Sequence, residues 1–341
     1  MKIVQVMLAK GFGGAERSFV DLSDELVNRG HEVIAVCEKR GEAKDLIKNA
    51  SVELVTVRGH WDPFAKLTIN RILQQAKPDI VHAHLARAAK IAGAAASKQG
   101  VPSVVKTHNY VDLKYYTHVS RLVPTTKDQQ RYLLSQGIPA DRITRIANFT
   151  SMPFVDNPRE FSPAKQIRMV AIGRFVAKKG FDLLIQALAC LPAELPVTLT
   201  LVGDGPQRTA LEQLVSANNL RERVRFVGWS NDVLAALDNA DLFVLSSTDE
   251  PFGIVCLEAM ARGVPIIATN TQGPSEFLDD SVAWLVDRDN IGALASGLQA
   301  AIDDPQRTTK QAEKALRLCK AQFSKQTIVT QYETLYSSLS P

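Results

Sequence analysis

The sequence predicts an α/β protein of two successive domains, each with a parallel sheet covered by helices on both faces. Three observations lead to this prediction. Short apolar runs alternate with amphipathic helical patterns along nearly the whole chain, as in repeated β-α-β units. The chain has 341 residues, which is long for one such domain and comfortable for two. The pattern breaks over residues 151–165, where three prolines come without periodicity, and then starts again.

The predicted elements of the first half follow from where apolar runs begin and end. A buried parallel strand is a nearly continuous apolar run, and a helix shows apolar residues every three to four positions until a Gly or Pro stops it. On these criteria strands are expected at 3–8, 31–37, 52–57, 79–84, 101–106 and 142–147, and helices at 15–29, 64–76, 86–99 and 127–135. Residues 122–126 lead into the last of these helices.

The second half repeats the same rhythm and closes with helices. Gly263 and Pro265 end one helix sharply before the next buried run. Strands are expected at 167–172, 197–202, 223–227, 242–245, 264–268 and 283–286, and helices at 181–191, 254–262, 290–303, 305–321 and 324–338. A further helix is expected after Pro206, ending at Ala217. The chain is therefore divided into a first domain (1–150), a linker (151–165), a second domain (166–322) and a C-terminal helix (323–341).

Composition excludes several classes of protein. An apolar share of 45% excludes a disordered chain. No apolar run approaches the ~20 residues of a membrane-spanning helix, and the run at the N-terminus is too short for a signal peptide. The four cysteines lack metal-binding spacing, so we expect buried free thiols in a reducing cytoplasm.

The net charge of +4 is distributed unevenly. Residues 1–150 carry 22 Lys and Arg against 14 Asp and Glu, whereas residues 151–341 carry 18 against 22. The basic first half suggests an anionic partner such as a phosphate-rich lipid surface, and a generically solvated basic face is an equal alternative. No block of basic residues is dense enough to indicate a nucleic-acid partner.

Two carboxylates flank a glycine in a strand–loop–helix–strand stretch. Glu250 lies in the loop and Glu258 about a turn and a half into the helix, with Gly253 between them. Such a loop lies at the carboxyl end of a strand, where open α/β sheets bind ligands. Carboxylates accept hydrogen bonds from paired hydroxyls, and the N–H groups of Gly253, Ile254 and Val255 suit a phosphate. The pattern favours a sugar or ribose next to phosphate over a capped helix with a solvated glutamate.

Two other loops at predicted strand ends have phosphate-binding features. Gly13 and Gly14 lie between the first strand and helix, although their spacing is not that of a strict dinucleotide fingerprint and a tight turn is the alternative. Arg174 and Lys179 flank a later turn, and such cations commonly clamp a diphosphate. Two fixed cations would stabilise the charge that grows on a diphosphate leaving group. No Asp-x-Asp pattern or His cluster suggests a divalent metal.

Several histidines lie at or near strand ends. His82 and His84 alternate on one predicted strand, and His82 is expected to be structural. His108 follows another strand at its carboxyl end, where it is expected at the ligand side of the sheet; a loop histidine bonded to backbone is the alternative. The loop 60–63, His-Trp-Asp-Pro, is a candidate acceptor-binding element.

These motifs resemble those of the retaining glycosyltransferases of family 4. Glu250-Pro-Phe-Gly, four residues, Glu258-Ala-Met-Ala, one residue, Gly263, one residue, Pro265 is similar to their nucleotide-sugar motif. Gly-Arg-x4-Lys-Gly from residue 173 is similar to their diphosphate clamp, and Gly-Gly-Ala-Glu-Arg from residue 13 to their first loop. The resemblance implies the GT-B fold, with two Rossmann-like domains facing a central cleft and the last helix crossing back to the first domain.

The resemblance also implies residue roles. Glu250 is expected near the donor sugar, without acting as a covalent nucleophile, and Glu258 on the ribose hydroxyls. His108 is expected to line the reaction centre, and the nucleotide base to lie near Val227. The implied mechanism is front-face attack in which a donor phosphate oxygen takes the acceptor proton. The catalytic candidates are therefore Glu250 and His108, and the donor-binding candidates are Gly13, Gly14, Arg174, Lys179, Val227, Phe252, Gly253, Ile254 and Glu258.

The resulting prediction is metal-independent, retaining transfer of a hexose from a UDP- or GDP-sugar to a hydroxyl acceptor. The acceptor is expected to be a glycan or lipid-linked molecule of lipopolysaccharide or other envelope glycan synthesis, at the inner face of the cytoplasmic membrane. A non-catalytic nucleotide-sugar-binding protein on the same fold is an alternative. An NAD-dependent oxidoreductase would need a Gly-x-Gly-x-x-Gly turn with an acid about 20 residues later, which the sequence lacks.

Overall fold

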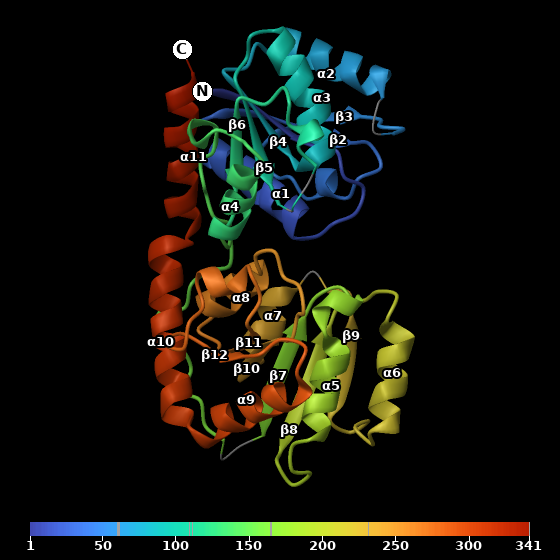
Figure 1. Ribbon diagram of the computed structural model, residues 1–341, viewed down its shortest axis with the longest axis vertical. Helices are drawn as coiled ribbons and strands as arrows, with labels where there is room; N and C mark the ends of the chain where they lie inside the picture. Colours follow the sequence, from blue (N-terminus) through green and yellow to red (C-terminus); the bar gives the residue numbers. More distant parts are fainter. Residues whose placement is uncertain (60–61, 109, 111, 164–165, 231, 341) are drawn as a thin grey trace. The chain divides into compact units, whose positions relative to one another are not determined.

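The computed structural model describes the chain except for residues 60–61, 109, 111, 164–165, 231 and 341. It divides into two compact units, residues 1–149 with 325–341, and residues 150–324. Each unit contains a six-stranded parallel sheet flanked by helices (Figure 1). The predicted class, α/β with two Rossmann-like domains, is confirmed. The described part of segment 151–165 groups with the second unit, and the C-terminal helix with the first.

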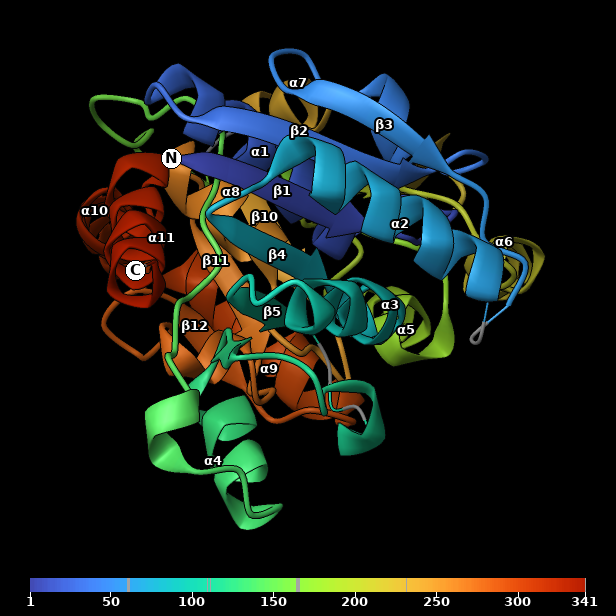
Figure 2. The same cartoon turned by 90° about the horizontal axis from the view of Figure 1, so that it is seen from above.

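The first unit has the strand order β3-β2-β1-β4-β5-β6. Successive strands are added on one side of β1 up to β3 and then on its other side from β4, so the strand order reverses between β1 and β4. Figure 2 shows helices α2 and α3 side by side over these strands. The strands are β1 (Lys2–Met7), β2 (Glu32–Glu38), β3 (Ser51–Val55), β4 (Ile80–His84), β5 (Ser103–Thr107) and β6 (Arg121–Pro124), and the helices are α1 (Gly14–Asn28), α2 (Pro63–Ala76), α3 (Leu85–Lys98), α4 (Lys127–Ser135) and α11 (Lys325–Leu339).

The two faces of the first sheet differ in polarity. On one face, Val4 and Val6 of β1 and Val81 of β4 pack into an apolar cluster with α2 and α3. The alternate residues Gln5 and His82 point to the other face because successive strand side chains alternate. That face carries contacts from α1 and α11, and it is where the buried polar side chains of this unit gather.

The second unit repeats the topology with the order β12-β11-β10-β7-β8-β9, and its reversal falls between β7 and β10. Ligands of such sheets bind outside the carboxyl ends of the strands at the point of reversal. The strands are β7 (Ile167–Ile172), β8 (Val197–Val202), β9 (Val224–Gly228), β10 (Leu242–Leu245), β11 (Ile266–Thr269) and β12 (Trp284–Val286), and the helices are α5 (Phe181–Ala189), α6 (Arg208–Ala217), α7 (Val233–Asp238), α8 (Ile254–Ala261), α9 (Ile291–Asp303) and α10 (Pro305–Gln322).

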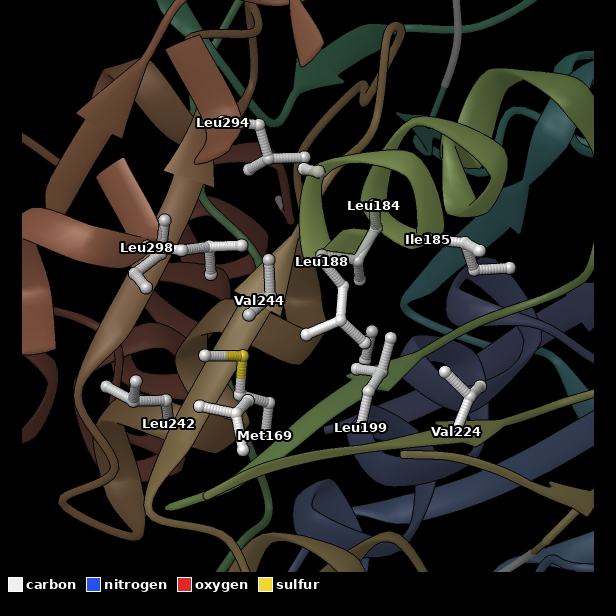
Figure 3. Packing of buried hydrophobic residues seen from close by; sticks show 14 of the residues in the cluster. Met169, Leu184, Ile185, Leu188, Leu199, Val224, Leu242, Val244, Leu294 and Leu298 are labelled. Carbon is white, nitrogen blue, oxygen red and sulfur yellow. The ribbon is translucent and has the colours of Figure 1, made fainter. Parts of the chain in front are cut away.

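A dry apolar core lies between this second sheet and two of its helices. Figure 3 shows Met169 and Val244 on adjacent strands facing Leu188 of α5, with Leu294 and Leu298 of α9 alongside. All of these side chains are at most 1% exposed. A sheet face covered in this way needs apolar residues at alternate positions of each strand, which is the pattern that made β7, β8 and β10 predictable.

One expected strand was wrong, and one helix was not expected. The strand expected at 142–147 does not form: a short 3-10 helix (Ala140–Arg142) leads into an isolated parallel bridge between Ile143 and Leu122. The apolar residues there pack against the sheet edge without extending the ladder. Helix α7 was not predicted, because its six residues are too few to show a helical period.

The cysteines depart in part from the expectation of buried thiols. All four are free; Cys37, Cys256 and Cys319 are buried, but Cys190 is exposed at the C-terminal end of α5. Burial raises the pKa of Cys37 and Cys319 to about 12, so these two thiols stay protonated near neutral pH.

Candidate functional site

Lys179 and Glu250 meet at the carboxyl edge of the second sheet. Lys179 lies in the loop after β7 and Glu250 in the loop after β10, and these strands are neighbours at the point of chain reversal. The Nζ atom of Lys179 is 2.5 Å from Oε2 of Glu250. Their side chains are only 18% and 11% exposed, so the pair is largely shielded from water. Two residues 71 positions apart thus form one charged centre where this fold class binds ligands.

The loop that carries Lys179 is fixed by backbone contacts with β10. Gly180 adopts a left-handed conformation (φ 59°), and a Cβ atom there would lie 2.1 Å from the carbonyl oxygen of Ser246. The Ser246 hydroxyl donates to the carbonyl of Lys179 at 3.0 Å. The N–H of Thr248 donates to the carbonyl of Lys178 at 2.9 Å. Close approach of these backbones therefore requires glycine at position 180.

Gly253 begins α8 next to Glu250. Its φ of 85° is left-handed, and an added Cβ would lie 3.2 Å from Pro274 and 3.4 Å from Cγ of Glu250. The loop after β11 supports this segment, since the N–H of Gly273 donates to the carbonyl of Glu250 at 3.0 Å. The first N–H groups of a helix have no partner inside the helix and carry its positive dipole. The N-terminus of α8, including Ile254, is therefore suited to an anion beside Glu250.

Glu258 is buried inside α8, with 6% of its surface exposed. Cys256 of the same helix is influenced by the charges of Glu258 and of the Lys179–Glu250 pair. Burial is the main cause that raises the pKa of the Cys256 thiol, and the charges of Glu250 and Glu258 raise it further, while Lys179 lowers it. The two predicted carboxylates and the predicted lysine thus all act electrostatically on the same buried thiol.

The remaining predicted residues of the second unit differ in exposure. Arg174 is exposed in the turn after β7, and Val227 is 47% exposed at the end of β9, beside the half-exposed Trp229. Phe252 is 5% exposed and packs on Phe277 at a ring distance of 5.3 Å. The Phe252 side chain therefore belongs to the core.

The predicted glycines of the first unit lie at the start of α1. Gly13 is the N-cap and Gly14 the first helical residue. Gly13 has an extended backbone (φ −163°), so its conformation does not demand glycine; an added Cβ would lie 3.4 Å from Oε2 of Glu16. Glu16 lies in the first turn, where its charge complements the helix dipole.

His108 follows β5 and is half-buried. Its Nε2 atom lies 3.4 Å from Nδ1 of His84, which is fully buried at the end of β4 and stacks on His82 with ring centroids 4.5 Å apart. Burial lowers the pKa of all three imidazoles well below the usual range, and the neighbouring Lys106 lowers each further, so the rings are neutral at pH 7.

The sequence analysis missed three buried polar residues around these histidines. Gln5 lies in the middle of β1, Lys106 in β5 and Tyr336 in α11, and each is fully buried. The signal for the first two was available, since each interrupts a run of Ile and Val in a strand with a polar side chain. Tyr336 gave none, because a tyrosine at helical spacing is ordinary in a packed helix.

The loop 60–63 is described in part. His60 and Trp61 lie outside the described residues. Asp62 is the N-cap of α2, accepting from the N–H groups of Phe64 at 2.9 Å and Ala65 at 3.1 Å. The backbone hydrogen bond from Arg58 is the largest of the causes that lower the pKa of Asp62. Its carboxylate is thus engaged in capping.

Comparisons with known proteins agree along the whole chain. The family model described as "Glycosyl transferases group 1" matches residues 155–317, and "Glycosyltransferase Family 4" matches residues 12–151. The lipopolysaccharide core biosynthesis glycosyltransferase LpsD of Rhizobium meliloti is 36% identical over 332 residues, covering 95% of both chains. LpsE of the same organism is 32% identical over 353 residues, covering 99% of both chains.

A solved structure shows the same similarity in three dimensions. The Anabaena protein Alr3699/HepE, crystallised in complex with UDP-glucose, matches with a TM-score of 0.84 and 25% identity. The match covers 99% of this chain and 100% of that chain.

Proposed function

The chain belongs to the group 1, family 4 glycosyltransferases of GT-B fold, and from that premise we propose that it transfers a hexose from a UDP-sugar to a hydroxyl of an envelope glycan, with retention of configuration. The observation that carries the proposal is the pairing of Lys179 with Glu250 beside the N-terminus of α8. UDP-glucose bound to the Anabaena relative supports a uridine donor, and the two Rhizobium relatives support a lipopolysaccharide acceptor.

The charges of the second unit suggest how each group acts. Lys179, Arg174 and the N–H groups at Gly253 would bind the diphosphate and stabilise the charge it gains as the sugar leaves. Glu258 would accept the ribose hydroxyls. Glu250 would give up part of its contact with Lys179 and accept hydrogen bonds from the sugar. The acceptor hydroxyl would attack from the face of the leaving group, and a phosphate oxygen would take its proton.

The test is donor turnover with a matched set of lysine variants. The protein is incubated with UDP-glucose, UDP-galactose, UDP-N-acetylglucosamine and GDP-mannose, and free UDP or GDP is measured. Lys179→Ala is expected to lower kcat/KM by on the order of 100-fold, because one clamp donor contributes about 3 kcal/mol to the transition state. The control is Lys178→Ala, whose side chain is half exposed and pairs with Asp249 at 3.5 Å.

Two outcomes of this experiment decide between functions, and a further measurement tests the stereochemistry. Equal turnover by Lys179→Ala and Lys178→Ala would refute the clamp. Donor binding without any release of nucleotide would indicate a nucleotide-sugar-binding protein instead. The anomeric configuration of the product, determined by NMR coupling constants, tests retention.

We also propose that the reaction needs no divalent metal. The cations Lys179 and Arg174 would supply the positive charge, and no group of three or more metal-ligating side chains occurs among the described residues. Turnover is expected to survive excess EDTA. Restoration of EDTA-abolished turnover by magnesium or manganese would contradict this.

Peripheral binding to an anionic cytoplasmic membrane surface is the last part of the proposal. Helix α2 exposes Phe64 (69%) and Leu67 (64%), and it carries Lys66 and Arg71 but no acidic residue. Exposed apolar side chains among basic ones are typical of helices that lie on anionic lipid. No helix in the described parts of the chain is long and apolar enough to span a bilayer.

Vesicle sedimentation tests the membrane surface. Binding to phosphatidylglycerol vesicles is expected to exceed binding to phosphatidylcholine vesicles and to weaken as salt rises. Phe64→Ser with Leu67→Ser should abolish it, whereas Leu134→Ser, an exposed leucine (42%) on α4, should not. Equal binding by both variants would rule out α2 as the contact.

A further inference from the structure

A continuous chain of hydrogen bonds runs from the C-terminal helix to His108 inside the first unit. The Nε2 atom of His108 lies 3.4 Å from Nδ1 of His84, and Nε2 of His84 lies 2.8 Å from Oε1 of Gln5. The amide nitrogen of Gln5 donates to the hydroxyl of Tyr336 at 3.4 Å, and that hydroxyl lies 2.6 Å from Nδ1 of His82. Each member except His108 is fully buried.

Pairing of strands brings these side chains together. In the ladder of the first sheet, Gln5 of β1 lies opposite His82 of β4, and His84 lies opposite Lys106 of β5. Side chains two apart on a strand share a face, so all four residues point to the side covered by α1 and α11. The Lys106 amine donates to Ser18 of α1 at 2.8 Å and lies 5.6 Å from the centre of the Tyr332 ring of α11.

Because the three imidazoles are neutral, each ring has one N–H and one nitrogen lone pair. The chain of hydrogen bonds therefore couples the tautomer of each ring to those of the others. The bond between Tyr336 and His82 sets the direction. Its 2.6 Å length lies in the range of O–H donors and below that of N–H donors. Tyr336 therefore donates to His82, and its oxygen accepts from the Gln5 amide.

The donor and acceptor roles of Gln5, His84 and His108 follow from this bond, because each group donates on one side and accepts on the other. With its amide nitrogen on Tyr336, Gln5 presents its carbonyl oxygen to His84, which must carry its proton on Nε2. The Nδ1 atom of His84 is then an acceptor, and His108 must donate to it from Nε2. The lone pair of His108 is left on Nδ1. The outer nitrogen of His82 has no partner among the described residues in either tautomer, so it does not decide the direction.

We propose that Gln5 and Tyr336 are positioning residues that hold His108 as the Nε2–H tautomer, with Nδ1 as the nitrogen that accepts a hydrogen bond from a substrate hydroxyl. The contribution to catalysis rests on the proposed function; the tautomer does not. The chain also gives α11 a role in the reaction, since a residue at the end of the sequence fixes the proton position on a ring in the first half.

The tautomers are measured on the full-length protein without substrate, by ¹⁵N–¹H correlation spectra of ¹⁵N-histidine-labelled protein at pH 7. Signals are assigned by single substitution of each of the six histidines. The expected result is the Nε2–H form for His82, His84 and His108. An Nδ1–H form of His108, or a mixture of both forms, would overturn the proposal.

Two tyrosine variants on the same helix make the comparison sharp. Tyr336→Phe removes the hydroxyl that orients Gln5, so the Nδ1–H form should appear at His84 and His108. Tyr332→Phe is the control, because Tyr332 is equally buried one turn away but its hydroxyl has no partner among the described residues. It should leave all three tautomers unchanged.

A second variant keeps the test possible if Tyr336→Phe fails to fold. Gln5→Met interrupts the chain of hydrogen bonds at its centre, and the Nδ1–H form is again expected to appear at His84 and His108. Unchanged tautomers in the folded variants would overturn the proposal.

Kinetics then separates this proposal from the proposed function. Tyr336→Phe is expected to lower kcat about tenfold with little change in KM for the donor, because part of the contribution of a positioned proton-transfer or hydrogen-bonding group is lost. An altered tautomer with unchanged kcat would overturn the positioning role. Absence of turnover in the wild-type protein with every donor would overturn the proposed function, and the spectra would still decide the tautomer.

Discussion

Lys106 is a fully buried lysine in the first unit, held by one hydrogen bond to Ser18 and by the face of Tyr332. Burial lowers its pKa from 10.5 to about 7, and the charge of Asp21 opposes this shift. The same amine helps to keep His82, His84 and His108 neutral. A cation at this buried position is costly for stability.

Replacing Lys106 by methionine should change how stability depends on pH. The unfolded state keeps the lysine proton up to about pH 10.5, whereas the folded state releases it near pH 7. The unfolded state therefore binds more protons between these values, and the free energy of unfolding rises with pH by up to about 1.4 kcal/mol per pH unit. The penalty of the buried charge is greatest below pH 7.

Urea unfolding of wild type and Lys106→Met at pH 6, 7.5 and 9 measures this effect. The variant should gain most relative to wild type at pH 6, and the difference should shrink as pH rises. Parallel stability curves for the two proteins would show that Lys106 does not titrate in this range.

Acid should destabilise the first unit through its neutral histidines. Unfolded histidines take up a proton below about pH 6.5, but buried His82 and His84 do so only at much lower pH. The free energy of unfolding should fall between pH 6.5 and 5, by up to about 1.4 kcal/mol per pH unit for each such histidine. His82→Phe keeps a ring at this position without the titration and should reduce the slope measured by urea unfolding. An unchanged slope would contradict burial of a neutral His82.

At the scale of elements, the site in the second unit depends on how closely its loops approach. Gly203, at the end of β8, would place a Cβ 1.9 Å from the carbonyl oxygen of Gly173, and Gly273 would place one 2.4 Å from the N–H of Phe252. The loops after four strands therefore pack backbone against backbone. These approaches fix the loops that carry Lys179 and Glu250.

Gly180→Ala tests this packing. The left-handed backbone costs about 1 kcal/mol for alanine, and the collision with the Ser246 carbonyl adds a larger displacement of the loop. Gly228→Ala is the control in the same unit, since Gly228 is also left-handed (φ 83°) but an added Cβ meets nothing within 4 Å. Gly180→Ala should lower the free energy of unfolding by more than Gly228→Ala in denaturant titrations. An equal loss of unfolding free energy in the two variants would show that the left-handed backbone accounts for the whole effect at position 180, and that the Ser246 carbonyl adds nothing.

At the scale of the whole molecule, the first unit is built from two distant parts of the chain. Helix α11 buries Ile328, Val329, Tyr332, Leu335 and Tyr336 in that unit. Its Glu333 accepts hydrogen bonds from Arg29 at 2.7 Å and contacts His31 at 3.0 Å. The first 149 residues are thus incomplete without the last 17.

Truncation after Ser324 should unfold the first unit and spare the second. Each large apolar side chain of α11 contributes about 1.5–3 kcal/mol of burial, so their joint loss is comparable with the whole stability of a domain. Limited proteolysis should then degrade the first unit and leave a fragment close to residues 150–324. Protection of residues 1–149 equal to that of the full chain would contradict this.

Particular elements show where sequence reasoning succeeds. β7, β8 and β10 have the predicted bounds because each is a buried apolar run with sharp polar ends. The strand expected at 142–147 did not form, since an apolar run at a sheet edge can pack without pairing. Charge and position at strand ends led to Lys179 and Glu250 as candidates, and the structure brings these two side chains together. The buried side chain of Phe252 was not foreseeable, because motif position does not tell which way a side chain turns.

The sequence by itself determined the α/β class, the repetition of the fold, the family and the charged residues at strand ends, because each depends on local pattern or on motif spacing. Tertiary structure decided what depends on contacts across the chain: the 2.5 Å pair of Lys179 and Glu250, and the chain from Tyr336 through Gln5 to His108. The physical reason is strand register. Pairing between β1, β4 and β5 sets Gln5 beside His82 and His84 beside Lys106, and no local pattern in the sequence encodes which residues will face each other.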